Sequence, residues 1–557
     1  MSVQIETAGG GRPRLAASRA RGRAYSLTAA LAASAAVLSI LASGFVFGAG
    51  EAMKTVALTD GLPALPAFAD DAAVQSLRQD PSLLWMMLSG SSESISASSL
   101  HLVLFILTRV LAMGGLLLLA GQLGVRRSAP RVVLMMLLAL TPLLHGFAFA
   151  GDEGGLFANH FSVAALAGSL ALFVWHALLR GRVGAALAFA GAVFACDAAT
   201  GLWQLAPIAL IGLALGQGGH FRHERARVEL LGGLALGMAV ALPSVQHALW
   251  AGAWALGDPN QGLLPGEFPV AQWVAMLGLA LAAAATLRLA PQRATASLVV
   301  LVAFLAVLGL GAVLPALDET AATRAWRLLD AGACVQALAA LGWGVLVVNC
   351  LFGEPGRDRQ VWAPLLLVAG MVHPWGVMAV PLFAMARTVR WPEVLDRVPA
   401  LLGLGLGICA FFVLHAIESR SLQVVRLDRV VSEWESVGMA IRVRSEHEAA
   451  STWVLLPATG PAAAEALALP DLLRHFAQRK PWVDGEWTSG NEQLQDRALR
   501  ARANEVRSLR GWDDKMAYAR RNGIGYVVDS CSGVEQAPGN VHRLLRAGSL
   551  CAVQVFP

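Results

Sequence analysis

Three carboxylates in one polar segment and an acidic pair in another are the residues of this chain best suited to acid–base chemistry. The first segment contains Asp70, Asp71 and Asp80, and the second contains Asp152 followed directly by Glu153. A carboxylate beside a hydroxyl group can remove its proton as the oxygen attacks, which predicts a general base, and a carboxylate can also bind a metal ion. The alternative for each residue is a solvated loop or the N-cap of a helix.

Three arginines are placed where they could neutralise a leaving phosphate. Arg324 and Arg327 follow Asp318 and Glu319 at the edge of an apolar stretch, and Arg109 lies inside another. The planar guanidinium group suits bidentate binding of phosphate. The alternatives are ion pairs with the neighbouring acids and, for Arg109, a side chain that reaches the membrane surface.

Four more polar residues are candidates for the lining of a cavity. Asp197 has apolar stretches on both sides, and an ionisable group at that depth in a membrane is a functional hypothesis by default. His373 precedes a proline at a similar break, His160 ends a polar segment, and Asp258 lies in the polar segment 251–269. The alternatives are an N-cap for Asp197 and hydrogen-bonded structural histidines.

The elements that must position these residues are transmembrane helices. Hydrophobic residues make up 56% of the chain and charged residues 15%, and the mean hydropathy is +0.57. Between residues 24 and 417 the apolar stretches alternate with short arginine-rich loops and with loops that carry carboxylates. This alternation predicts about twelve transmembrane helices with the arginines on the cytoplasmic side. Because the arginines cluster where topology needs them, the net charge of +5 does not indicate nucleic-acid binding.

The expected topology starts with a basic cytoplasmic N-terminus at residues 1–23, followed by a transmembrane domain at 24–417. The loops expected on the opposite face are 51–100, 150–160, 251–269 and 318–330. The stretches 183–196 and 361–372 are too short to cross a hydrocarbon core of about 30 Å as helices. They predict two short helical hairpins whose tips line an outward-facing cavity. For 361–386 a single helix kinked at Pro374 is the alternative, and it would reverse the orientation of everything that follows.

From residue 418 to 557 the composition becomes that of a soluble domain, and alternating helix and strand patterns predict an α/β fold. Cys531 and Cys551 flank a predicted terminal hairpin and could form a disulfide, which would favour an oxidising compartment. Two unpaired thiols are the alternative. No Cys/His spacing typical of a metal site occurs in the sequence.

The layout resembles the GT-C superfamily of polytopic membrane glycosyltransferases, in particular bacterial members of unassigned substrate. The similarity rests on five short motifs spread over most of the chain: Asp80-Pro-Ser-Leu83, Asp152-Glu153, Gly201-Leu-Trp203, His373-Pro374, and Phe476–Asp484 with the Gly523–Val528 strand. Asp197-Ala-Ala stands where relatives often carry His-Pro. Asp258–Gln261 stands where they tend to carry a histidine pair.

The resemblance implies a bacterial inner-membrane protein with a periplasmic C-terminal domain that transfers a sugar from a polyprenyl-phosphate donor. Asp152 or an aspartate of the first loop would act as base or metal ligand, and the arginines would bind the lipid phosphate. A divalent cation, Mg²⁺ or Mn²⁺, is the cofactor that such a leaving group could use. The expected partners are membrane lipids, the lipid-linked sugar and an envelope-assembly protein.

Two other functions remain open at this stage. A non-catalytic membrane scaffold or assembly partner on the same fold would explain the departures at Asp197 and at Asn260-Gln261. The broken helices also occur in transporters, although transporters rarely end in a large external α/β domain.

Overall fold

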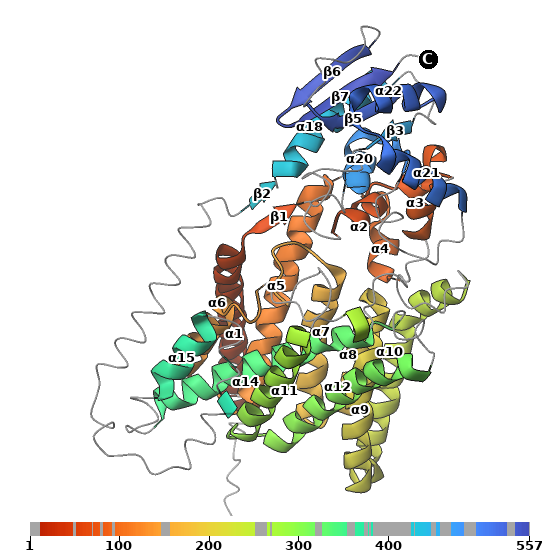
Figure 1. Ribbon diagram of the computed structural model, residues 1–557. Coiled ribbons are helices and arrows are strands. Elements are labelled where there is room, and N and C mark those ends of the chain that lie inside the picture. The colour runs from red at the N-terminus through yellow and green to blue at the C-terminus, as the bar shows by residue number, and fades with distance from the viewer. Residues whose placement is uncertain are drawn as a thin grey trace, which may run out of the picture.

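The computed structural model shows a bundle of membrane helices with a separate α/β domain above one end (Figure 1). It describes residues 12–47, 52–69, 71–77, 82–91, 95–145, 156–250, 265–267, 270–317, 326–353, 362–372, 377, 380–381, 425–427, 429–446, 453–456, 469–483, 497–531 and 541–555. We call the end of the bundle that carries the α/β domain the domain side, and the other end the arginine side.

Within the described residues, seven helices are long and apolar enough to cross a membrane, and three shorter apolar helices accompany them. The chain therefore folds as a helical membrane protein. The bundle consists of α1 (Arg12–Ser43), α5 (Ala97–Gln122), α6 (Ser128–Leu140), α7 (Val163–Leu179), α8 (Val183–Cys196), α9 (Ala198–Gln217), α10 (Glu224–Trp250), α11 (Val270–Arg288), α12 (Ala294–Val313), α14 (Gly332–Phe352) and α15 (Ala363–Val372). Short 3-10 helices lie at Leu62–Ala64, Pro66–Phe68, His220–Arg222, Pro265–Glu267, Leu314–Leu317 and Leu328–Ala331.

Side-chain caps mark where two of these helices begin on the domain side. Ser96 accepts a hydrogen bond from the backbone N–H of Ser99 at 3.3 Å, and Ser162 accepts one from Ala165 at 3.1 Å. Each cap satisfies one of the backbone donors that the first turn of a helix leaves unpaired. The caps fix the start of α5, which supplies His101 and Arg109 to the candidate site, and of α7, which begins just after His160.

The first predicted hairpin is present. Helix α8 ends at Cys196, Asp197 has an extended backbone with φ −140° and ψ 110°, and α9 begins at Ala198. The second predicted hairpin, at 361–386, and the predicted span at 401–416 lie largely or wholly outside the described residues.

Close helix packing in the bundle depends on glycines where α8 meets α10. A Cβ atom added to Gly233 would lie 1.9 Å from the carbonyl oxygen of Gly184, and one added to Gly191 would lie 2.2 Å from that of Gly237. The two backbones therefore approach to a distance that only glycine permits, as is common between membrane helices.

Between α1 and α5 the chain forms a compact loop, which we call the first loop. It contains β1 (Phe45–Phe47), α2 (Ala52–Thr59), α3 (Ala72–Leu77) and α4 (Leu83–Leu88). Strand β1 pairs in parallel with β2 (Val425–Leu427), which leads into the C-terminal domain. The exit from the first helix and the entry to the last domain therefore lie side by side, as Figure 1 shows.

The C-terminal domain is a five-stranded sheet between two layers of helices, as the sequence predicts. The strand order is β4-β3-β5-β7-β6, with β3 parallel to β4 and β5, and β7 antiparallel to β5 and β6. Helices α18 and α20 pack on one face of the sheet, and α21 and α22 pack on the other. The elements are α18 (Arg429–Arg444), β3 (Trp453–Leu455), α20 (Leu469–Ala477), β4 (Lys480–Pro481), α21 (Arg497–Ser508), α22 (Gly511–Arg521), β5 (Tyr526–Ser530), β6 (Val541–Ala547) and β7 (Leu550–Val555).

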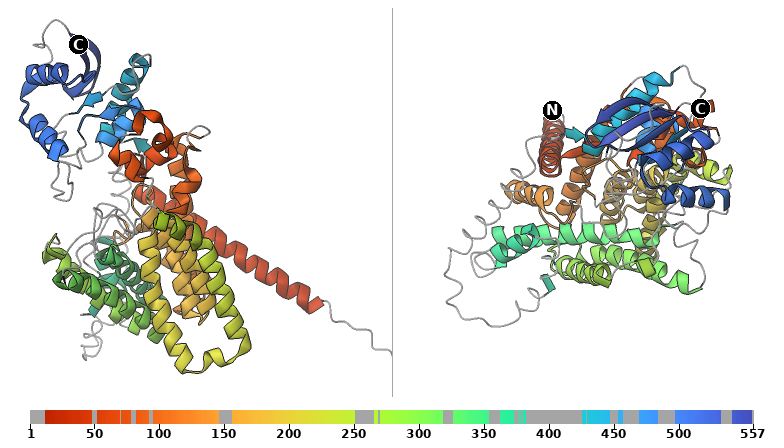
Figure 2. Two further views of the ribbon diagram at one scale, coloured as in Figure 1. Left: turned by 90° about the vertical axis from the view of Figure 1, so that its right-hand side faces the viewer. Right: turned by 45° about the horizontal axis from the view of Figure 1, so that its top comes forward.

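One hydrophobic core joins this domain to the bundle. It contains Phe45 and Phe47 of β1, Trp85 of α4 and Phe105 of α5, together with Trp434 of α18 and other residues of the domain. Figure 2 shows the domain seated over the first loop, while α1 extends away from the other helices toward its N-terminal end. The first loop is thus the support on which the domain rests.

We expect Gly233→Ala to destabilise the bundle because the new Cβ would force α10 away from α8, at a cost of about 1–3 kcal/mol. Thermal unfolding of the purified protein in nanodiscs measures the effect. Gly232→Ala is the matched control, because nothing lies within 4 Å of a Cβ at Gly232. Equal melting temperatures for the two variants would contradict the close α8–α10 approach.

Candidate functional site

The contact between the first loop and the C-terminal domain is built on a buried ion pair. Arg474 of α20 donates through Nε to Asp71 Oδ2 at 2.9 Å and through Nη2 to Asp71 Oδ1 at 3.0 Å. The side chains are only 3% and 6% exposed. Arg474 also donates through Nη1 to Asp471 at 2.9 Å. Such a bidentate pair is strong and directional, and losing one partner would leave a buried charge uncompensated.

The position of Asp71 follows from the local fold of the first loop. Its Oδ1 accepts a hydrogen bond from the backbone N–H of Val74 at 3.2 Å, at the start of α3. Gln75, one residue further along, donates to the carbonyl oxygen of Phe68 at 2.8 Å. The sequence suggested Asp71 as a base or as an N-cap. In the structure Asp71 caps the start of α3 and also binds Arg474 of the C-terminal domain. Both of its carboxylate oxygens accept hydrogen bonds.

A second polar contact crosses the same boundary. Asp60, at the end of α2, lies 2.5 Å through Oδ2 from Nδ1 of His475, the residue that follows Arg474. The imidazole packs against Phe47 and Phe476, with ring centroids 6.0 and 4.5 Å away. The Asp60 side chain is 7% exposed and that of His475 is 18% exposed. A carboxylate that orients a partly exposed imidazole is an arrangement able to transfer protons.

Two more histidines lie on the bundle side of this pair. His101 of α5 is buried against Phe47, Trp85 and Phe161, with ring centroids 5.7–6.0 Å apart. His160, predicted from the sequence to line a cavity, is also buried, and its Nδ1 lies 3.1 Å from Asn159 Oδ1. His475, Asp60 and His160 are all close enough to His101 for electrostatic interaction. We call Asp60, His101, His160 and His475 the histidine cluster.

Arg109 lies below the histidine cluster on the same face of α5. His101, Phe105 and Arg109 are spaced by four residues, so they form one stripe about 12 Å long. The guanidinium group is fully buried between the rings of Phe105 and Phe157, 4.8 and 4.6 Å from their centroids. It is level with the end of α1, because Nη2 donates to Ser43 Oγ at 3.1 Å.

The hydrogen bonds of Arg109 leave part of its capacity unused. Nη2 also donates to the carbonyl oxygen of Ala158, whereas Nε and Nη1 have no partner among the residues that the structure describes. A buried guanidinium group with unused donors is costly unless an anion approaches it. The phosphate-binding role of Arg109 stays a prediction, and the two nitrogen atoms without partners are consistent with it.

The other described candidates are held by local partners. Asp197 accepts a hydrogen bond from the Thr200 hydroxyl at 2.5 Å, at the start of α9. Arg327 forms an ion pair with Asp330 at 2.7 Å. The alternative interpretation anticipated the ion pair of Arg327. Asp197 stands at the N-cap position of α9, but its side chain makes no capping hydrogen bond to the backbone of the described helix. Cys531 and Cys551 are joined by a disulfide that links the end of β5 to β7.

The remaining candidates lie outside the described residues. They are Asp70, Asp80, Asp152, Glu153, Asp258, Arg324 and His373.

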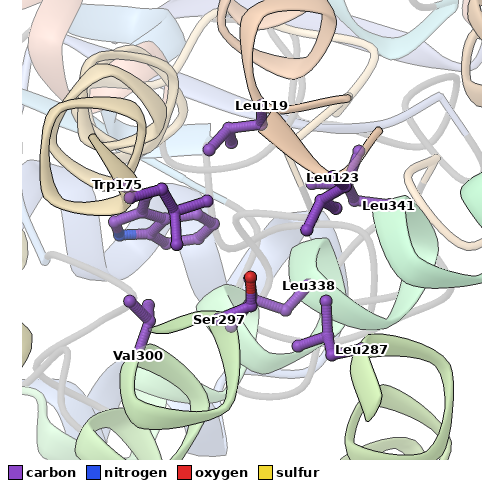
Figure 3. Close-up of a pocket in the computed structure, with 9 residues that line it drawn as sticks. Leu119, Leu123, Trp175, Leu287, Ser297, Val300, Leu338 and Leu341 are labelled. Carbon is purple, nitrogen blue, oxygen red and sulfur yellow. The ribbon is translucent and has the colours of Figure 1, made fainter. Parts of the chain in front are cut away.

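A small cavity in the described part lies far from the histidine cluster, toward the arginine side. Figure 3 shows it between Leu119, Trp175, Leu287 and Ser297. Its lining is apolar and its free volume is about 10 Å³, which is too small for a sugar. Among the described residues, no three His, Cys, Asp or Glu side chains are arranged to hold a metal ion.

Sequence reasoning missed Asp60, His101, Arg474 and His475. Asp60 precedes Gly61, which has a φ of +67°, so the pair looks like an ordinary turn. Arg474 and His475 immediately precede the motif that begins at Phe476. Their partners are 403 and 415 residues away in the chain, and local sequence carries no signal of such a pairing.

No family model matches the chain, and no curated protein matches it either.

We expect Arg474→Met to loosen the C-terminal domain by about 3–5 kcal/mol, because Asp71 would remain buried without its partner. Hydrogen exchange of α20 in the full-length protein would rise accordingly. The double variant Asp71→Leu/Arg474→Met should recover part of the protection, since it removes the buried Asp71 charge while Asp471 still loses its bond to Arg474. If the single variant matches the wild type, the ion pair does not hold the domain.

Replacing Arg109 with lysine should lower the thermal stability even though the positive charge is kept. An ammonium group cannot fill the flat space between Phe105 and Phe157 while reaching both Ser43 and Ala158. Arg126→Lys provides the control, because Arg126 is exposed and Gln292 is its only hydrogen-bond partner among the described residues. Unfolding of the variants in nanodiscs measures the difference, and equal stability would exclude a shape-specific role for Arg109.

Proposed function

We propose that the chain is a GT-C-like glycosyltransferase of the bacterial inner membrane, with about twelve spans and its domain side facing the periplasm. It would transfer a sugar from a polyprenyl-phosphate donor to an acceptor on that side. The observation that carries the proposal is the Asp60–His475 pair. It places proton-transfer groups on the domain side, between the first loop and the C-terminal domain.

Loop positions support this orientation. On the arginine side, Arg126 donates to Gln292 at 2.8 Å, so two arginine-bearing loops meet there. Positively charged loops favour the cytoplasm. The Cys531–Cys551 disulfide lies in the C-terminal domain, at the opposite end, and suits an oxidising compartment.

The path of the chain between α15 and β2 also favours the hairpin interpretation of 361–386. The hydroxyl of Thr141, just past the domain-side end of α6, donates to the carbonyl oxygen of Gly370, so α15 runs toward the domain side. Strand β2 lies on that side as well. Under the proposed topology the chain would cross the membrane an even number of times between them. A hairpin followed by a span at 401–416 meets this requirement, whereas a single kinked helix does not.

The proposed chemistry divides between two groups. His475, oriented by Asp60, would accept the proton of the acceptor hydroxyl as that oxygen attacks the anomeric carbon. The bond from that carbon to the lipid phosphate breaks, and the phosphate leaves as an anion. Three cations could neutralise the phosphate. They are Arg109, whose Nε and Nη1 have no partner among the described residues, Arg324 and Arg327. Asp152 remains the competing candidate for the base.

Transfer from purified polyprenyl-phosphate sugars, with the protein in nanodiscs, tests the proposal. We expect His475→Gln to lower the rate by about 10²–10⁴-fold and Asp60→Asn to lower it less, because Asp60 acts through His475. His223→Gln, an exposed residue near the arginine side, should keep the wild-type rate. If Asp152→Asn abolishes transfer while His475→Gln does not, the base is Asp152. Absence of transfer from every donor would refute the function.

A non-catalytic scaffold is the second candidate, and a specific observation favours it. Asp71, Asp197 and Arg327, three residues selected for chemistry, are each engaged in a structural contact. A protein of this kind would bind the lipid-linked sugar without turnover. The same nanodiscs, assayed for donor binding and for product, distinguish the two functions.

A further inference from the structure

Two tryptophans meet at the β4 edge of the C-terminal sheet. Trp453 begins β3, and Trp482 directly follows β4, where its backbone N–H donates to the carbonyl oxygen of Val454 at 2.8 Å. The two indole rings are perpendicular, at 88°, with centroids 5.4 Å apart. Both side chains are only half-buried, unlike Trp343 and Trp434, which lie fully inside the protein. Large aromatic rings held at a surface in this way provide a rigid contact area for a ligand.

Each indole carries a cation on one of its faces. The Lys480 ammonium group lies 4.7 Å from the Trp453 ring centroid, and the Arg502 guanidinium group lies 4.1 Å from that of Trp482. The perpendicular contact between the rings uses one more face. Both rings also pack against the hydrophobic core of the domain, so each presents only part of its surface outside the protein.

Arg502 and Glu505 place a donor and an acceptor beside the rings. Arg502 makes no hydrogen bond or ion pair with any residue in the described part of the chain, so its N–H groups remain available. Glu505 is exposed and lies three residues further along α21, close to Arg502 on the helix surface.

A chain of hydrogen bonds fixes the carboxylate relative to the ring. The Trp482 indole N–H donates to the Tyr518 hydroxyl at 3.2 Å, and that hydroxyl donates to Glu505 Oε2 at 3.2 Å. Burial raises the pKa of Tyr518, so its hydroxyl keeps the proton that it donates. The ring and the carboxylate are thus positioned before any ligand arrives, which reduces the entropy cost of binding.

We propose that Trp453, Trp482, Arg502 and Glu505 form a saccharide-binding site on the C-terminal domain. A pyranose ring has an apolar C–H face that can lie against the exposed part of these half-buried indoles. Its hydroxyl groups can donate to a carboxylate and accept from a guanidinium group at the same time. The assignment of this saccharide as the acceptor of the transfer rests on the proposed function. Binding itself does not.

Saturation-transfer NMR on the full-length protein in nanodiscs tests the site. The probes are tetrasaccharides of glucose, mannose, N-acetylglucosamine and galacturonic acid, each without a lipid donor. We expect at least one to bind, with an affinity at least tenfold lower in Trp482→Ala. Glu505→Gln alters an exposed side chain and keeps the fold, and its affinity should fall about threefold or more. Arg520→Ala, an exposed change on α22, should bind as the wild type does.

The outcomes separate this inference from the proposed function. If none of the four probes binds, or if Trp482→Ala and Glu505→Gln bind as tightly as the wild type, the site is refuted. A protein that binds a probe but transfers no sugar keeps the site and loses the proposed function. A protein that transfers sugar but binds no probe keeps the function and loses the site.

Discussion

The buried pair between Arg474 and Asp71 is the interaction on which the arrangement of this molecule depends. It connects the first loop to the last domain across 403 residues, and both side chains are almost completely removed from water. Two such charges are tolerated there only together. The pair therefore gives the docking of the domain a single register, and it brings His475, the next residue, onto Asp60. The histidine cluster exists because this contact exists.

The stripe of His101, Phe105 and Arg109 on α5 connects the histidine cluster to the interior of the helix bundle. His101 faces the aromatic rings beneath the docked domain, and Arg109 lies about two helical turns lower, at the level where α1 ends. Phe105 separates them and contacts Phe45 of β1, with ring centroids 5.0 Å apart. The histidine cluster and the buried cation are thus stacked at different depths. Under the proposed function, Arg109 would lie nearer the lipid phosphate at the membrane surface, and the histidine cluster would lie nearer the soluble acceptor above it.

Sequence reasoning predicted the elements better than it predicted the site. Hydropathy located the membrane helices, and the break at Asp197 was visible because α8 is too short to cross a bilayer. The α/β domain followed from alternating patterns. The polar contacts did not, because Asp60 and Asp71 look like turn and cap residues, and nothing local distinguishes a carboxylate that meets an arginine of a distant helix. Asp71 was a candidate base because of its residue type alone. Its ion pair with Arg474 instead indicates a structural role.

Cutting the chain between the bundle and the domain tests the docking most directly. A protease site inserted between Glu418 and Ser421 would separate residues 425–557 from the membrane part while leaving β1, β2 and the first loop intact. Size-exclusion chromatography in mild detergent then shows whether the fragment remains attached. Docking through Arg474, Asp71 and the shared core predicts that the cut fragment elutes with the bundle. A fragment that elutes alone, with the wild-type sequence at positions 71 and 474, would contradict it.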